Sequence, residues 1–142
     1  MPPSMDAPLE TQIGRFLALA QEQNGCRYLQ QRIAREGAEG ATMVLNEVFP
    51  YLVSLMMDPF ANYFYQKLLE HTAPEQRLAM LEYVRAHLLV ASLNLHGTRS
   101  VQKHIEVGGR HPAQRAIIEE ELGPHITKLS MDTNGNHVVQ RM

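Results

Sequence analysis

Apolar residues recur along the chain at intervals of three and four, which is the spacing of one face of an α-helix. In the first such segment, residues 11–23, the apolar positions include Ile13, Phe16, Leu17 and Leu19. No segment alternates apolar and polar residues in the manner of a half-buried strand. The pattern predicts an all-α chain with helices at about residues 11–23, 25–35, 39–48, 51–57, 60–70, 73–85, 88–93, 97–106, 112–122, 124–130 and from 136 onward.

Turn and capping residues set the ends of these segments. Gly37 is expected to end the helix that begins near residue 25, and Gly123 the helix that begins at Pro112. Thr72 and Glu75 have the spacing of a capping box, in which a hydroxyl and a carboxylate satisfy the first backbone N–H groups of a helix.

A seven-residue stretch occurs four times. Its clearest copy is NGNHVVQ at residues 134–140, and the other copies begin at Asn24, Phe60 and His96. The glutamine that closes each copy is residue 30, 66, 102 or 140, so the steps are 36, 36 and 38 residues. A fixed period in this range indicates a solenoid, in which each unit buries its core against its neighbours. Each period holds one short helix, the helix with the repeated stretch, and one outer helix.

Each copy places three polar or flat side chains together on its helix, here called a trio. The first residue and the glutamine are four apart and therefore lie on one face, while the flat residue after the first lies about a third of a turn round. The trios are Cys26, Arg27 and Gln30; Asn62, Tyr63 and Gln66; Thr98, Arg99 and Gln102; and Asn136, His137 and Gln140. A flat group that stacks and two polar groups that meet a Watson–Crick edge are what recognition of a single-stranded base requires.

At these residues the chain resembles the Pumilio (PUF) family of RNA-binding repeat proteins, over residues 11 to 142. The resemblance implies a right-handed α-solenoid of three-helix Pumilio-type repeats, an armadillo-like superhelix. Three prolines within residues 1–8 predict a flexible lead at residues 1–10. The repeats are expected at about residues 11–46, 47–85 and 86–122, followed by an incomplete one at 123–142. Because the family typically has eight repeats, the chain is expected to be a fragment with the first four, without the half that binds the 5′ UGU.

The family's code, carried over to the trios, implies a base for each repeat. The trios that begin with Cys26 and Asn62 are expected to take adenine and uracil, respectively. The trio of Thr98 is expected to take adenine with weak discrimination, and that of Asn136 to take uracil or several bases. Since the family binds RNA antiparallel, the partner would be single-stranded 5′-UAUA-3′, the 3′ half of a UGUA-type element. The implied role is mRNA 3′ UTR binding that regulates stability or translation, with protein co-regulators on the convex face.

Two features depart from regular repetition. Ala61 replaces the glycine of the other copies, which alanine can do if φ is negative there. Leu93 lies five residues before Thr98, whereas Leu55 lies seven before Asn62. This predicts that the turn before the third trio is shorter by two residues.

Composition limits the compartment and the partners. The net charge of −2 is unusual for a protein that binds phosphates, but the charges are placed unevenly. Basic residues occur on the trio-bearing helices: Arg27, Arg32, Arg35, Lys67, Arg99, Lys103 and Arg141. Acidic residues occur on the others: Glu36, Glu39, Glu47, Glu75, Glu82, Glu119, Glu120 and Glu121. These positions predict a basic inner face and an acidic outer face, unless both are simply solvated helix surfaces. One cysteine allows no internal disulfide and favours the cytoplasm, and no apolar run approaches the ~18 residues of a membrane span.

Other functional classes have little support in the sequence. No H-E-x-x-H, cysteine pair, glycine-rich phosphate loop or G-x-S-x-G elbow occurs, so no enzyme activity, metal site or cofactor is expected. Two alternatives remain: a protein-binding solenoid scaffold of the armadillo or HEAT type, and a Pumilio-like protein that binds nucleic acid without sequence preference. Substitution of Asn62 and Gln66 separates them, because base preference changes only if the trios recognise bases.

Overall fold

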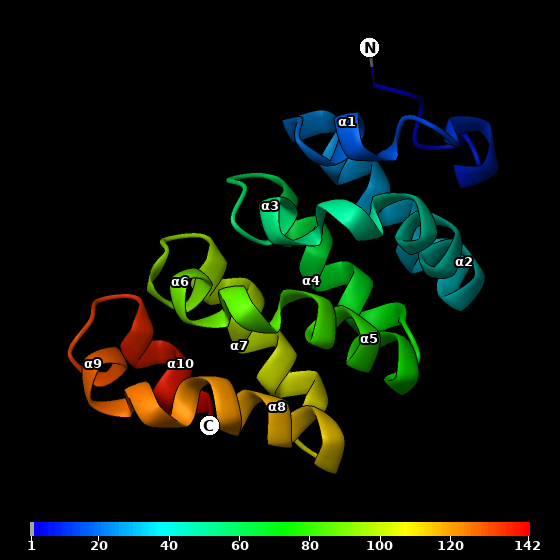
Figure 1. Ribbon diagram of the computed structural model, residues 1–142. Coiled ribbons are helices and arrows are strands. Elements are labelled where there is room, and N and C mark those ends of the chain that lie inside the picture. Colours follow the sequence, from blue (N-terminus) through cyan, green and yellow to red (C-terminus); the bar gives the residue numbers. More distant parts are fainter. Residues whose placement is uncertain (1) are drawn as a thin grey trace.

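The computed structural model describes residues 2–142, and the secondary structure of this part of the chain is entirely helical (Figure 1). The α-helices are α1 (Phe16–Ala20), α2 (Gln23–Val48), α3 (Leu52–Met56), α4 (Ala61–His71), α5 (Pro74–Val84), α6 (Leu88–Leu93), α7 (Gly97–Gly108), α8 (Pro112–Leu122), α9 (Ile126–Ser130) and α10 (Gly135–Arg141). The 3₁₀-helices are η1 (Leu9–Gln12), η2 (Phe49–Tyr51), η3 (Arg85–His87) and η4 (Gly123–His125). Within residues 2–142, no helix is long and apolar enough to cross a membrane.

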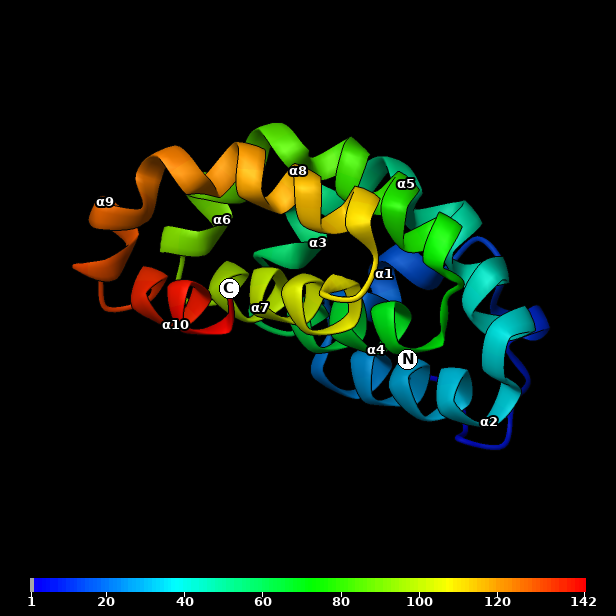
Figure 2. The same cartoon turned by 90° about the horizontal axis from the view of Figure 1, so that it is seen from below.

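The helices form a row of three-helix units, which confirms the predicted solenoid. The first half of α2 packs against α4, α4 against α7, and α7 against α10. These four helical segments carry the trios and are called the trio helices below. Figure 2 shows that they form one layer of the molecule, while α5 and α8 lie side by side in a second layer. The short helices α1, α3, α6 and α9 each precede one trio helix.

A kink at Gly37 divides α2 into two parts that lie in different layers. The helix runs from Gln23 to Val48, but Gly37 has φ 68° and ψ −146° inside it. This left-handed conformation is unfavourable for residues with a Cβ and accessible to glycine. The predicted break at Gly37 is therefore confirmed. Residues before it form the first trio helix, and residues after it form the first outer helix.

The helix predicted at residues 11–23 is wrong in its extent. The structure has η1 and α1 there instead, separated by Gly14 with φ 91°. Ile13, one of the apolar positions of that segment, is 62% exposed, whereas Phe16 is fully buried. The Glu47 carboxylate explains the break, because it accepts hydrogen bonds from Gly14 N (2.6 Å) and Phe16 N (2.9 Å). These bonds hold the start of α1 against the end of α2.

The start of η1 and the residues just before it also contact α2. Leu9 is fully buried, and its backbone N–H donates to the Glu36 carboxylate at 2.9 Å. The Tyr28 hydroxyl donates to Ala7 O at 2.6 Å. In the structure the packed part of the chain therefore includes Leu9, ahead of the expected start of the repeats at residue 11. The flexible lead and the repeat boundaries stay predictions.

The predicted capping box before α5 is shifted by one residue. Thr72 does not cap the helix, because its hydroxyl donates back to Leu68 O at 2.8 Å. The N-cap residue is Ala73, whose backbone N–H donates to the Gln76 side chain at 2.8 Å. Gln76 thus performs the reaching-back half of the motif that the sequence assigned to Glu75.

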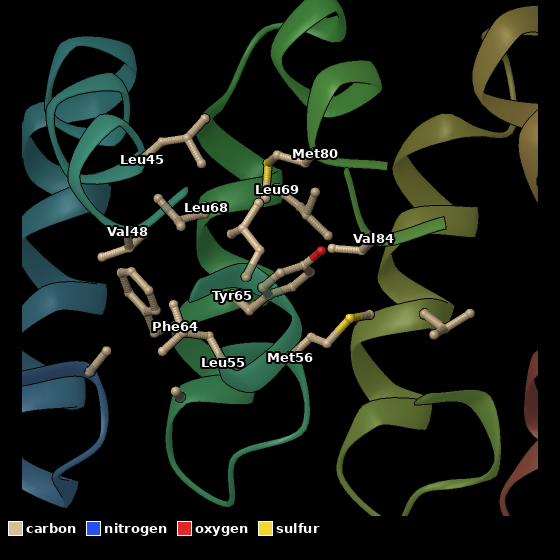
Figure 3. Close-up of a cluster of buried hydrophobic side chains, with 14 of the residues drawn as sticks. Leu45, Val48, Leu55, Met56, Phe64, Tyr65, Leu68, Leu69, Met80 and Val84 are labelled. Carbon is tan, nitrogen blue, oxygen red and sulfur yellow. The ribbon is translucent and has the colours of Figure 1, made fainter. Parts of the chain in front are cut away.

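The core lies between the two layers and runs along the solenoid. Figure 3 shows the part around α4, where Phe64, Tyr65, Leu68 and Leu69 are fully buried. The neighbouring elements contribute Leu45 and Val48 from α2, Leu55 and Met56 from α3, and Met80 and Val84 from α5. Burial of one such side chain contributes about 1.5–3 kcal/mol. Because each unit shares its core with the next, the trio helices are held in a fixed register.

Candidate nucleic-acid interface

The structure places the predicted trios at corresponding positions on four adjacent helices. The trios lie on the first half of α2, on α4, on α7 and on α10, and these helices neighbour one another in that order. Each trio occupies the first two turns of its helix. The repeated sequence period has therefore become a repeated spatial array along one layer (Figure 2).

Within every trio the glutamine is hydrogen-bonded to the first residue. Gln30 Nε2 donates to Cys26 Sγ at 3.2 Å, and Gln102 Nε2 donates to Thr98 Oγ1 at 3.2 Å. Gln66 and Gln140 donate in the same way to the side-chain oxygens of Asn62 (3.3 Å) and Asn136 (3.1 Å). The predicted pairing on one face is confirmed. Each pair presents the glutamine with its orientation already set.

The first residues of the trios are more buried than the sequence suggested. Cys26, Asn62 and Thr98 are 3%, 0% and 5% exposed, while Asn136 is half-buried. The glutamines are more accessible: Gln140 is exposed and the other three are half-buried. The more accessible polar group of each trio is therefore the glutamine, and the first residue acts beside it from a recessed position.

Those first residues are held in two different ways. The Asn62 amide donates to Asp58 O (2.9 Å) and Pro59 O (3.0 Å), both in the turn before its own helix. Asn136 donates in the same way to Asp132 O (2.8 Å) and Thr133 O (2.9 Å).

Cys26 and Thr98 instead contact the following repeat. The Cys26 thiol donates to Phe60 O at 3.1 Å, and the Thr98 hydroxyl donates to Asn134 O at 2.8 Å. Burial raises the pKa of the Cys26 thiol, so the sulfur keeps the proton that this bond requires. The first and third repeats are thus tied to their successors through the trio itself.

The flat residues of the trios lie on the surface. Arg27, Tyr63, Arg99 and His137 are all exposed. The Arg99 guanidinium carbon lies 5.6 Å from the centre of the Tyr63 ring, and Arg99 Nη1 donates to the Tyr63 hydroxyl. The flat groups of the second and third repeats therefore contact each other directly in a cation–π arrangement.

A hollow of about 470 Å³ lies between the first and second trio helices. Its lining contains the whole first trio together with Gln23, Pro59, Phe60 and Tyr63. Its volume is in the range of ligand sites, roughly 300–1,000 Å³. A planar group in this hollow would be within reach of Arg27, Gln30 and Tyr63, which line it.

The sequence profile of the Pumilio-family RNA binding repeat matches four segments of the chain, at residues 15–49, 51–84, 92–122 and 125–142. The chain belongs to the Pumilio family. Each matched segment contains one of the four trios.

Related Pumilio proteins support the assignment over almost the whole chain. The Pumilio domain-containing protein C6G9.14 of Schizosaccharomyces pombe is 38% identical over 135 residues, which cover 95% of this chain and 20% of the relative. Pumilio homolog 12 of Arabidopsis thaliana is 40% identical over 131 residues, covering 90% of this chain and 22% of the relative. The chain thus spans about a fifth of the length of these relatives.

Solved Pumilio structures share the fold. The Puf4 RNA binding domain bound to an HO endonuclease RNA 3′ UTR recognition sequence has a TM-score of 0.85 and 40% identity, covering 91% of this chain and 40% of that one. The Puf3 RNA binding domain bound to a Cox17 RNA 3′ UTR recognition sequence has a TM-score of 0.87 and 27% identity, covering 95% and 38%. Two fifths of such a domain are therefore represented here.

Asp and Asn side chains in three of the turns before the trio helices hold the backbone that leads into the trios, a feature that was not predicted from the sequence. The four segments, called the leading turns, are residues 22–24, 58–60, 94–96 and 132–134, and the first of them already includes the first two residues of α2. In the last three, an Asp or Asn side chain accepts two successive backbone N–H groups. The signal in the sequence was an Asp or Asn four residues before the first trio residue, at Asp58, Asn94 and Asp132.

The third leading turn is not shorter than the others, so that prediction is wrong. Backbone N–H groups at Asp58 and Asp132 donate to Leu55 O and Leu129 O, and the equivalent Asn94 donates to Ala91 O. Ala91, not Leu93, is therefore the counterpart of Leu55, and the spacing to the trio is the same. The two extra residues of the longer period lie between α7 and α8 instead, because α8 begins 15 residues after α7 but α5 begins 13 after α4.

Close approach, rather than backbone conformation, explains the glycines before the trios. A Cβ at Gly25 would lie 2.4 Å from Leu19 O, and one at Gly97 would lie 2.6 Å from Ala91 O. Neither glycine has a positive φ. Ala61 occupies the same place in the second repeat with negative φ and is fully buried, as the sequence analysis required.

The predicted basic face is partly neutralised. Lys67 and Lys103 both pair with Glu70, at 3.2 and 3.1 Å, and Lys103 also lies 3.5 Å from Glu106. Arg32, another of the predicted basic residues, is 8% exposed and pairs with Glu36 at 2.8 Å. Carboxylates on the trio helices themselves thus offset part of the positive charge. They are Glu70 and Glu106, which the sequence prediction did not include, and Glu36, which it placed on an outer helix but which precedes the kink at Gly37. Within residues 2–142, Arg27, Arg99 and Arg141 are exposed and make no ion pair, whereas the exposed Arg35 lies 3.9 Å from Asp6.

Proposed function

We propose that the chain binds single-stranded RNA of mRNA 3′ UTRs in a sequence-specific manner, with one base per repeat. The observation that carries this proposal is the array of four trios in register, each with a pre-oriented glutamine beside an exposed flat side chain. The Puf4 and Puf3 domains, whose folds match, are bound to RNA 3′ UTR recognition sequences. A peptide-binding scaffold has no need for this repeated combination of groups.

Hydrogen-bonding chemistry supports uracil at the second repeat. Because two carbonyl oxygens accept from the Asn62 amide nitrogen, the side-chain oxygen must point the other way, toward Gln66. A base would therefore meet an acceptor from Asn62 and a donor from Gln66 Nε2. Uracil offers N3–H beside O2, which complements this pair. Cytosine has an unprotonated N3, which would place two acceptors opposite each other.

The fourth repeat has the same arrangement, so Asn136 and Gln140 also favour uracil. At the first and third repeats, Cys26 and Thr98 use their hydrogens on backbone carbonyls and offer only an acceptor beside the glutamine. The family resemblance assigns adenine there. The proposed target is therefore 5′-UAUA-3′, with the first repeat at the 3′ end.

The gross binding energy of this chain is modest. Stacking contributes about 1–3 kcal/mol per base, or roughly 4–12 kcal/mol for four bases before the RNA is ordered. The regulatory consequences follow from the family: control of mRNA stability or translation in the cytoplasm, with co-regulators on the outer layer. These remain predictions.

Fluorescence anisotropy tests the proposal. Labelled UGUAUAUA would be compared with RNA changed at its last four bases, using the parent chain and Gln66→Ala. A preference of the parent for the intact 3′ half, with a weaker preference in Gln66→Ala, is the expected result. Equal binding of both RNAs would indicate a non-specific nucleic-acid binder. Absence of binding by a folded chain would refute RNA recognition by these four repeats.

A further inference from the structure

The leading turns of the second and fourth repeats are built around one carboxylate oxygen each. Asp58 Oδ2 accepts from Phe60 N (2.9 Å) and Ala61 N (2.8 Å). Asp132 Oδ2 accepts from Asn134 N and Gly135 N, both at 2.8 Å. Such a side chain fixes the path of a turn by satisfying backbone N–H groups that the following helix leaves free. These bonds from the backbone of Gly135 and Asn134 lower the pKa of Asp132, so its carboxylate stays ionised near neutral pH.

The same two turns hold the asparagines that are proposed to contact uracil. The carbonyls of Asp58 and Pro59 point at the Asn62 amide nitrogen, and those of Asp132 and Thr133 at the nitrogen of Asn136. In each turn the carboxylate thus holds the backbone N–H groups, and the backbone carbonyls hold the asparagine amide. If the carboxylate no longer fixes the turn, the carbonyls lose their common direction.

We propose that Asp58 and Asp132 are specificity-determining positioning residues, which orient the amides of Asn62 and Asn136 so that an oxygen rather than a nitrogen faces the base. This inference rests on the proposed function. Rotation of an amide by half a turn exchanges an acceptor for a donor. The rotated form would complement the unprotonated N3 of cytosine instead of the N3–H of uracil. The turn therefore determines uracil over cytosine without touching the base.

The other two repeats provide controls within the chain. The first leading turn has Glu22 at the corresponding position, and this residue makes no side-chain cap bond. Its trio begins with Cys26, which has no amide to orient. The third turn has Asn94, whose Oδ1 accepts from His96 N (2.9 Å) and Gly97 N (2.8 Å). A neutral amide can therefore do what the carboxylates do, which makes Asp→Asn the conservative replacement.

The test measures base preference rather than affinity alone. The parent, Asp58→Ala, Asp58→Asn and the control Glu22→Ala would each be titrated with UGUAUAUA and with the same RNA carrying cytosine at its seventh base, opposite the second repeat. Loss of one oriented hydrogen bond changes an equilibrium by about threefold to tenfold. The ratio of the Kd for the cytosine RNA to the Kd for the uracil RNA is expected to fall by that factor in Asp58→Ala. It is expected to stay at the parent value in Asp58→Asn and Glu22→Ala.

A purely structural role would weaken binding of both RNAs equally and leave the ratio unchanged, which would overturn the proposal. A parent without any uracil preference would refute the proposed function, and this inference with it. Asp132→Ala, tested with cytosine at the fifth base, is a second and independent case in the half-buried fourth turn. If Asp58→Ala does not fold, Asp132→Ala decides the matter by the same ratio. Side-chain amide exchange of Asn136 in that variant, measured by NMR without RNA, is expected to be faster than in the parent.

Discussion

A buried tyrosine–histidine pair joins the second and third repeats, and its removal should show how strongly they are coupled. The Tyr65 hydroxyl on α4 and His104 Nε2 on α7 are 2.6 Å apart, and both side chains are fully buried. Their rings also meet edge to face, with centres 5.5 Å apart. His104 Nδ1 has no hydrogen-bond partner within residues 2–142. The pair thus satisfies one of two buried ring nitrogens.

Tyr65→Phe keeps the ring contact but leaves the histidine without any partner. A buried polar group left unsatisfied costs about 1–3 kcal/mol. His104→Leu leaves the tyrosine hydroxyl unsatisfied and should cost a similar amount. Leucine is a suitable replacement, because Leu68 occupies the corresponding position of the second repeat. The double variant removes both polar groups together and is expected to be much less destabilised than the sum of the single variants.

Urea denaturation of the parent and the three variants, followed by circular dichroism, gives the four free energies of unfolding. The expected coupling energy is about 0.5–3 kcal/mol in favour of the pair. RNA affinity should not change, because neither residue belongs to the exposed face of a trio. Single costs that add to within about 0.5 kcal/mol would refute the argument that the two residues satisfy each other.

Three further outcomes are expected. Burial, with the charge of Arg77 as a smaller cause, lowers the pKa of His104 from 6.5 to about 3. Below pH 6.5 the unfolded chain therefore takes up a proton on this histidine that the folded chain does not bind, so the free energy of unfolding should fall as the pH drops. In His104→Leu the free energy of unfolding, measured by urea denaturation at several pH values, should depend less on pH in this acidic range. Gly97→Ala should lower the thermal midpoint of unfolding, because the new Cβ would lie 2.6 Å from a backbone oxygen of α6. At the equivalent position of the second repeat, Ala61→Gly should lower the free energy of unfolding by only about 1 kcal/mol or less. Glu70→Gln should release Lys67 from its ion pair and leave Lys103 paired only with Glu106. RNA binding at low salt should strengthen, with a steeper salt dependence of Kd than the parent; unchanged affinity would mean that these lysines lie away from the phosphates.

Local rules predicted the fold where both ends of a helix are marked nearby. Helix α8 matches its predicted range because Pro112 suits the first helical position and Gly123 follows the last. The break at Gly14 could not be predicted in the same way. It depends on Glu47, a residue 33 positions away whose carboxylate is brought there by the packing of α2. Periodicity reports which face of a segment is apolar, but not where a distant side chain interrupts it.

The same distinction applies to the site. The pairing of each glutamine with the residue four before it follows from helix geometry and was predicted for all four trios. Bonds between repeats were not, because Cys26 meets Phe60 and Thr98 meets Asn134 only after the units have stacked. Cys26 and Thr98 are buried where these contacts form, so their burial was missed for the same reason.

The third repeat shows why hydrogen bonding, rather than residue type, defines the register of a solenoid. Comparison of leucines aligned Leu93 with Leu55 and predicted a shortened turn, but the backbone bond from Asn94 to Ala91 O places Thr98 level with the other first residues. Displacement of the third trio therefore does not explain the weak base discrimination expected at the third repeat. On the proposed function, the weak discrimination expected there is attributed to Thr98, whose hydroxyl hydrogen is already committed to Asn134 O. Thr98 then offers only an acceptor beside the Gln102 donor, without the oriented amide that Asn62 and Asn136 provide.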